Sequence, residues 1–248
     1  MAVFDGREQM STELTQSSRP FLTARWQHLI LANYAVEPSL LAPYLPPGLE
    51  LDLFDGAPHV SLVAFDFLDT RVLGIPWPGY RHFPEINLRF YVRQGDRRGV
   101  AFVREYVPKR AIAWIARWLY NEPYCYAPMR SRVTEQTEGL QVEHWLRREG
   151  KESRVRVLAD PVPHTPSEDS EAHFFKEHSW GYGTSRRGAL VTYEVAHPVW
   201  ATHEVRDLQM DWDWVSIYGP QWAHLADQTP RSVYLALGSE ISVSPKQG

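Results

Sequence analysis

The 248-residue sequence contains one cysteine, Cys125, so no disulfide can form within the chain. A single thiol is typical of a reducing compartment, and we expect a cytoplasmic protein. No apolar run approaches the roughly 20 residues that a membrane-spanning helix requires. The first 20 residues are polar, carry acids and lack the apolar core of a secretion signal. The sequence therefore predicts neither membrane insertion nor export.

The sequence also lacks an excess of positive charge, because 26 Lys and Arg face 30 Asp and Glu and the formal net charge is -4. Lysine and arginine are scattered along the chain, whereas a nucleic-acid-binding surface requires them to be clustered. We therefore expect no nucleic-acid partner. Aromatic residues are abundant instead, with 10 Trp, 12 Tyr and 10 Phe. Large rings can fill a core or line an enclosed pocket for an apolar ligand.

The sequence pattern predicts one domain over residues 20–248, preceded by a flexible polar arm at residues 1–19. Helical signals are few, and we place helices at 38–44, 108–120 and 170–178. Strand patterns dominate the rest of the chain. They cover residues 26–34, 49–53, 59–67, 86–92, 100–107, 130–136, 140–148, 153–159, 188–197, 199–209 and 232–243.

Two turns predict which of these strands are paired. Asp55-Gly56 separates 49–53 from 59–67, and this spacing predicts a hairpin. A second hairpin is expected around residues 94–98. The absence of a βαβ rhythm favours an α+β, mainly β protein: a closed antiparallel β-barrel with a few short flanking helices. Such a barrel leaves an interior for a small ligand.

Two segments then resemble acetoacetate decarboxylase and its relatives. They are the run from Ala24-Arg25-Trp26 through Tyr44-Leu45-Pro46-Pro47-Gly48, and Val103-Arg104-Glu105-Tyr106-Val107-Pro108-Lys109-Arg110. The second is similar to the family's segment around its Schiff-base lysine. The layout as a whole is more similar to an uncharacterised bacterial family, the domain of unknown function 2071. The matching segments are residues 83–92, 110–129 and 193–200, and the resemblance implies an acetoacetate-decarboxylase-like fold.

Lys109 is the candidate catalytic residue. A lysine attacks a carbonyl only as the neutral amine, although the pKa of a free lysine is about 10.4. Burial, a neighbouring cation and the positive end of a helix all favour the neutral form. Lys109 directly precedes Arg110 at the predicted start of a helix. The three effects act together if this end of the helix faces the barrel interior.

The resemblance suggests roles for other charged residues. Glu85 is placed to transfer protons, and Arg25 to hold a substrate carboxylate with two hydrogen bonds. The two-residue period of a strand puts Glu85, Asn87 and Arg89 on one face, which makes Arg89 a second candidate for substrate binding. This face lies inside the barrel if Ile86 and its apolar neighbours are covered from outside.

Each of these residues also has a structural interpretation. Lys109 and Arg110 can be solvated residues that flank a helix. Glu85 and Arg89 can form a structural ion pair, and Arg25 can serve only to anchor a loop.

Other chemistries have little support. The pairs His197/His203 and His173/His178 lack a recognised metal-ligand spacing, and we predict no metal site and no cofactor. There is no Gly-x-Ser-x-Gly motif of a serine hydrolase.

Two functions remain open from the sequence. The first is a Schiff-base lyase, a decarboxylase or a related enzyme, that acts on a small oxo acid through Lys109. The second is a non-catalytic barrel that binds a small apolar ligand or serves as a scaffold. The sequence leaves the substrate and the oligomeric state open.

Overall fold

The computed structural model describes residues 20–119, 121 and 123–247. The predicted arm at residues 1–19 lies outside the described residues. The helices are short: α1 Pro38–Leu41, α2 Arg110–Leu119, α3 Glu171–Lys176 and α4 Trp214–Tyr218, with 3-10 helices η1 Ala42–Tyr44 and η2 Pro220–Ala226. The strands are β1 Leu22–Ala35, β2 Glu50–Leu51, β3 His59–Val72, β4 Phe83–Gln94, β5 Arg97–Val107, β6 Tyr124–Tyr126, β7 Met129–Gln136, β8 Gly139–Arg148, β9 Lys151–Ala159, β10 Trp180–Thr184, β11 Leu190–Ala196, β12 Thr202–His203, β13 Val205–Asp211 and β14 Ser232–Val243. The mainly β prediction is therefore confirmed.

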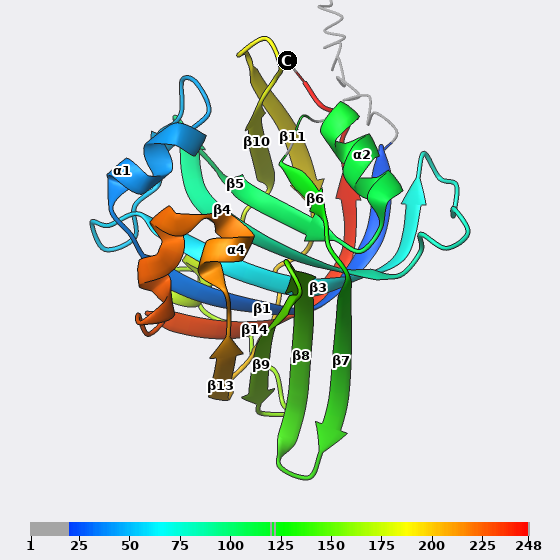
Figure 1. Ribbon diagram of the computed structural model, residues 1–248, viewed down its shortest axis with the longest axis vertical. Helices are drawn as coiled ribbons and strands as arrows, with labels where there is room; N and C mark the ends of the chain where they lie inside the picture. Colours follow the sequence, from blue (N-terminus) through cyan, green and yellow to red (C-terminus); the bar gives the residue numbers. More distant parts are fainter. Residues whose placement is uncertain (1–19, 120, 122, 248) are drawn as a thin grey trace, which may run out of the picture.

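A ten-stranded sheet forms the body of the protein (Figure 1). Its hydrogen-bonded path runs β2-β4-β3-β1-β14-β11-β10-β5-β6, and β12 adds to β14. An additional pairing joins β4 to β5, so the strands from β4 round to β5 form a ring. The β4–β5 pairing is the predicted hairpin, and it begins at the pair Gln94↔Arg97.

The joint between β10 and β5 is one of the two shortest in the ring. It is parallel and consists of the pairs Trp180↔Gly99 and Gly181↔Val100. A Cβ atom on Gly99 would collide with the carbonyl oxygen of Trp180 and the ring of Tyr182. Only glycine allows this close approach. The prediction of a wholly antiparallel sheet is wrong here, and again where β5 pairs with β6 in parallel, because local patterns do not show which distant strands meet.

A separate four-stranded sheet, β13-β9-β8-β7, covers one side of the ring. The β7–β8 hairpin extends away from the body (Figure 1). The largest apolar core contains side chains from both sheets and from α4 and η2, including Leu88, Val157 and Trp222. A second core gathers around Phe65 and Trp200 on the other face of the ring strands. The ring strands are therefore buried on both faces.

Two of the predicted helices follow from their local signals. Ser170 caps α3, since its hydroxyl accepts a hydrogen bond from the backbone N–H of His173 (3.2 Å). Pro38 opens α1 at the first helical position. Helix α2 begins at Arg110 rather than at Pro108. Among the described residues, no helix has the length and apolar character required to cross a bilayer.

Two strand predictions are wrong. The Asp55-Gly56 turn closes only an isolated bridge between Phe54 and Ala57, and β2 then pairs with β4 rather than with β3. The expected strand at 199–209 is divided. Its first part, β12, pairs with β14, whereas β13 joins β9 in the second sheet. Both errors concern pairing partners, which depend on contacts between residues far apart in the chain.

The Gly99 joint can be tested with two glycine variants. We expect Gly99→Ala to lower the free energy of unfolding by about 2 kcal/mol, because the added methyl group must displace Trp180 or Tyr182. Gly183→Ala is the matched control, since a Cβ atom at this β10 position meets nothing within 4 Å. Urea denaturation compares the two, and equal stability of both variants would contradict the proposed constraint.

Candidate functional site

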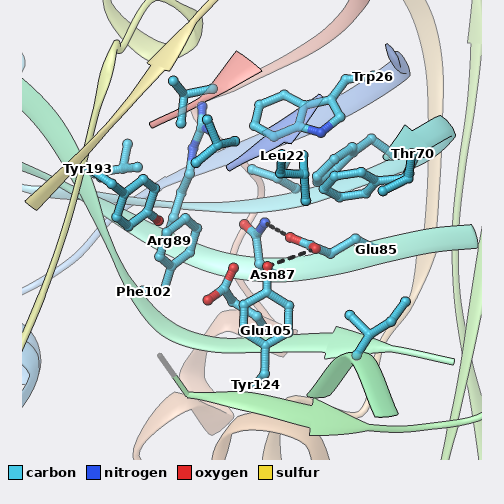
Figure 2. A pocket seen from close by; sticks show the side chains of 18 of the residues that line it. Leu22, Trp26, Thr70, Glu85, Asn87, Arg89, Phe102, Glu105, Tyr124 and Tyr193 are labelled. Atoms are coloured by element: carbon cyan, nitrogen blue, oxygen red, sulfur yellow. Dashed lines mark hydrogen bonds between the residues drawn. The ribbon is translucent and has the colours of Figure 1, made fainter. Parts of the chain in front are cut away.

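A pocket of about 520 Å³ lies against the inner face of the ring (Figure 2). Every ring strand contributes to its lining, and helix α2 contributes Ala111, Ile112 and Ile115. Most of the lining is aromatic or aliphatic, from residues that include Leu22, Trp26, Phe65, Phe67, Phe83, Phe102, Tyr193 and Trp200. Exposed Trp77 and Tyr80, from the loop between β3 and β4, also reach the pocket. This volume suits a small organic molecule.

One wall of the pocket is polar. Glu85, Asn87 and Arg89 follow each other at two-residue spacing along β4 and all line the pocket, as the sequence predicts. The intervening Ile86 and Leu88 lie in the core on the other face. Glu105 of β5 is the cross-strand partner of Asn87 and joins the same wall. A polar interior face on β4 is therefore confirmed.

Hydrogen bonds fix the carboxylate of Glu85. The amide of Asn87 donates to Oε1 (3.0 Å), and the hydroxyl of Tyr124 donates to Oε2 (3.1 Å) (Figure 2). Glu85 is only 3% exposed and Glu105 only 2%. Two buried carboxyl groups facing one cavity are a frequent feature of sites that transfer protons.

Arg89 lies further along β4 and is 8% exposed. Its Nη2 atom donates to the backbone carbonyl of Phe175 (2.8 Å). Its Nε atom is buried without a hydrogen-bond partner among the residues that the structure describes. No ion pair found between described residues includes Arg89. The guanidinium is thus only partly satisfied by the protein.

The sequence analysis did not identify two buried polar residues at this part of the pocket. Lys176, the last residue of α3, has a fully buried side chain, and its ammonium pairs with Glu177 (2.5 Å). His178 lies two residues further on and packs against Tyr91 in a tilted arrangement, with ring centroids 4.9 Å apart. Both residues line the pocket. The only sequence signal for Lys176 was its place directly after Phe174-Phe175 on the apolar side of a short helix.

The segment around Lys109 lies beside the pocket. Lys109 is half-buried at the start of α2, where its carbonyl accepts a hydrogen bond from Ala113. It is not one of the lining residues, although Ala111 and Ile112 are. Arg110 is exposed, and its guanidinium lies over the ring of Tyr126 (4.9 Å). The helix begins two residues later than the sequence predicts, and these two side chains are not among those that line the cavity.

Arg25 lies on β1 outside the pocket lining. Its guanidinium forms a 3.7 Å ion pair with Asp69, and both side chains are well exposed. Exposed pairs of this kind contribute little to stability. The structure therefore brings Glu85 and Arg89 together in the pocket and places Arg25, Lys109 and Arg110 around it. Among the described residues, no three His, Cys, Asp or Glu side chains form a group that could hold a metal ion.

Comparison with known proteins identifies the family. The family model of DUF2071, described as an uncharacterized conserved protein, matches residues 23–240. The chain belongs to this family. The chain is also similar to the uncharacterized protein YqjF of Bacillus subtilis (strain 168). The two are 30% identical over 179 residues, which cover 71% of this chain and 72% of YqjF.

Solved structures share the fold of this DUF2071 protein. The enduracididine biosynthesis enzyme MppR, complexed with pyruvate, has a TM-score of 0.64 at 15% identity, over 96% of this chain and 93% of MppR. Acetoacetate decarboxylase from Legionella pneumophila has a TM-score of 0.62 at 11% identity, over 100% of this chain and 97% of the enzyme. At these identities the likeness establishes an acetoacetate-decarboxylase-like fold and no particular activity.

The burial of His178 predicts a dependence of stability on pH. Burial lowers the pKa of His178 well below its ordinary 6.5, and the charge of Arg89 lowers it further. The unfolded chain therefore takes up a proton below pH 6.5 that the folded protein resists, and stability falls as the pH falls. The expected loss is about 1.4 kcal/mol for one pH unit below 6.5.

His178→Phe should remove this loss. We expect the free energy of unfolding of the variant to fall less than that of the wild type between about pH 7 and about pH 5.5. The exposed His224→Gln serves as the control. Urea denaturation at the two pH values measures the difference, and parallel pH profiles for wild type and His178→Phe would show that the imidazole is not held neutral.

Proposed function

We propose that this protein is an enzyme that binds a small oxo acid in the pocket and converts it through a Schiff base. The observation that carries the proposal is the polar wall of Glu85 and Arg89 inside a cavity whose lining is mostly apolar. The fold supports the proposal, because it is shared with acetoacetate decarboxylase and with an enzyme whose structure contains pyruvate. We also propose that the ring works as a closed barrel around the ligand, in a cytoplasmic protein.

The proposed amine is Lys109, as the sequence resemblance implies. The neutral amine adds to the carbonyl carbon, the carbonyl oxygen leaves as water, and an iminium ion forms. The iminium then accepts the electron pair of a bond to the adjacent carbon. This bond is the C–CO2 bond in the decarboxylation of a 3-oxo acid, or a C–H or C–C bond in a related aldol or dehydration step. Glu85 would supply and accept the protons of these steps, since its carboxyl group faces the cavity.

The arginines have different proposed tasks. Arg110 would favour the neutral amine of Lys109 through its adjacent charge. Arg89 would bind the substrate carboxylate from inside the pocket, and Arg25 would do so at its edge. Lys109 is two residues from Ala111, which lines the pocket. Its side chain would therefore have to turn across the start of α2 to meet a bound carbonyl.

A non-catalytic binding protein is the second candidate function. The absence of Lys109 from the described lining favours it. In that case the pocket would hold an apolar or acidic ligand without covalent chemistry, and Lys109→Ala would leave ligand binding and stability unchanged.

Reductive trapping separates the two functions. The protein is incubated with pyruvate, acetoacetate or phenylpyruvate, treated with borohydride, and analysed by peptide mass spectrometry. We expect one oxo acid to leave a reduced adduct on Lys109, and Lys109→Met to abolish it. The controls are Lys151→Met, which changes an exposed lysine of β9, and Lys176→Met, which removes the buried amine.

An adduct on Lys176 would retain the Schiff-base mechanism and contradict the assignment of the amine to Lys109. The absence of an adduct on either lysine with all three acids would contradict the mechanism itself and favour the binding protein.

A further inference from the structure

The buried end of the pocket is formed by Arg89, Lys176 and His178, and we call these three residues the deep end. They are 8%, 1% and 8% exposed, whereas Trp77, which also lines the pocket, is 54% exposed. Arg89 and Lys176 are joined through the chain, since the carbonyl that accepts from Arg89 belongs to Phe175. The deep end is therefore one connected cluster, and it is much less exposed than the loop at Trp77.

The charges of the deep end do not cancel. The ammonium of Lys176 is matched by the carboxylate of Glu177, which also accepts the backbone N–H of Trp200 (3.1 Å). His178 is held neutral by burial, which lowers its pKa. Arg89 is left with a neutral carbonyl as its hydrogen-bond partner and with no ion pair among the described residues. Within the deep end, one positive charge is therefore left without a counter-ion.

The hydrogen-bonding groups are unsatisfied as well. The Nε atom of Arg89 and both ring nitrogens of His178 are buried without a partner within the described part of the chain. Buried polar atoms almost always have a partner in native proteins. Two neighbouring side chains that lack one, both facing the same cavity, indicate that a ligand supplies it.

We propose that the deep end is an anion subsite that holds the single carboxylate of a ligand with an apolar body. A monoanion matches the one uncompensated charge, whereas a dianion such as a phosphate would leave charge buried without a partner. The body would lie along the aromatic lining, which includes Phe65, Phe67 and Phe102.

The two carboxyl groups of the polar wall fix the direction of the ligand. Glu85 and Glu105 lie on the part of the wall before Arg89, and like charge there repels the carboxylate toward the deep end. A reactive group on the ligand would then lie between the deep end and Glu85. This inference deepens the proposed function by naming the class of acid, yet it requires neither a carbonyl group nor a reactive lysine.

Calorimetry with three unreactive probes tests the subsite. We expect 3-phenylpropanoate to bind at least roughly tenfold more tightly than its neutral amide, 3-phenylpropanamide, because a buried guanidinium bonds a carboxylate more strongly. Acetate, which lacks the apolar body, should bind more weakly than 3-phenylpropanoate. Equal affinity of the acid and the amide, or no binding of the acid at millimolar concentration, would overturn the assignment.

Variants locate the effect. Arg89→Met should remove the preference for the acid over the amide, whereas Arg93→Met, an exposed position on the same strand, should retain it. His178→Phe is the second test should Arg89→Met fail to fold. We expect this variant to bind 3-phenylpropanoate roughly threefold more weakly than the wild type, with little change in the affinity for the amide. An unchanged preference in the folded variants would overturn the subsite.

The outcome is separable from that of the trapping experiment. Carboxylate binding that depends on Arg89, without any trapped adduct, supports the subsite and contradicts the Schiff base.

Discussion

Strand β4 is covered on both of its faces, and the alternation of its side chains determines what the interior contains. The residues that point away from the pocket, such as Ile86 and Leu88, pack in the core beneath the second sheet and α4. The residues that alternate with them, such as Glu85 and Arg89, point to the opposite face and are shielded from bulk solvent there. Polar groups in such a place require partners from the protein or from a ligand. Glu85 has two such partners, Asn87 and Tyr124. In Arg89, Nη2 donates to a backbone carbonyl, whereas Nε has no partner among the described residues.

This difference along one strand gives the pocket two chemical ends. At one end, hydrogen bonds from Asn87 of β4 and Tyr124 of β6 position the buried carboxyl group of Glu85, and Glu105 of β5 lies on the same wall. At the other, a guanidinium, an ion-paired ammonium and a neutral imidazole meet where α3 leads into β10. The parallel joint at Gly99 holds β10 against β5 and so brings the deep end onto the polar wall. The aromatic lining between the two ends keeps the dielectric low, and charge interactions with a ligand there are stronger than they would be in water.

Local signals in the sequence were sufficient for some of this arrangement. The alternation around residues 85–90 predicts the polar interior face, the turn at 94–98 predicts the β4–β5 hairpin, and Ser170 predicts the start of α3. The pairing of β2, the division of 199–209 and the parallel joint were missed, since they depend on contacts between distant segments. Lys176 was missed for the same reason, because a lysine at the end of a short helix is ordinarily solvent-exposed and only the tertiary structure buries it. The motif at Lys109 predicted the start of α2 to within two residues, but a motif carries no information about the direction of a side chain.

The position of the substrate carboxylate bears on which reaction the pocket would favour. A guanidinium that binds a carboxylate stabilises the charge that decarboxylation removes, so Arg89 would stabilise the ground state of that reaction more than its transition state. A reaction in which the carboxylate is kept does not have this cost. With the carboxylate in the deep end, an iminium next to it can accept electrons from the carbon on its other side, where Glu85 faces the cavity. In the proposed mechanism and orientation, the two ends of the pocket would thus favour aldol or dehydration chemistry of an oxo acid over loss of its carboxylate. Decarboxylation would require the acid to bind in the reverse direction, with its carboxylate toward Glu85 and Glu105.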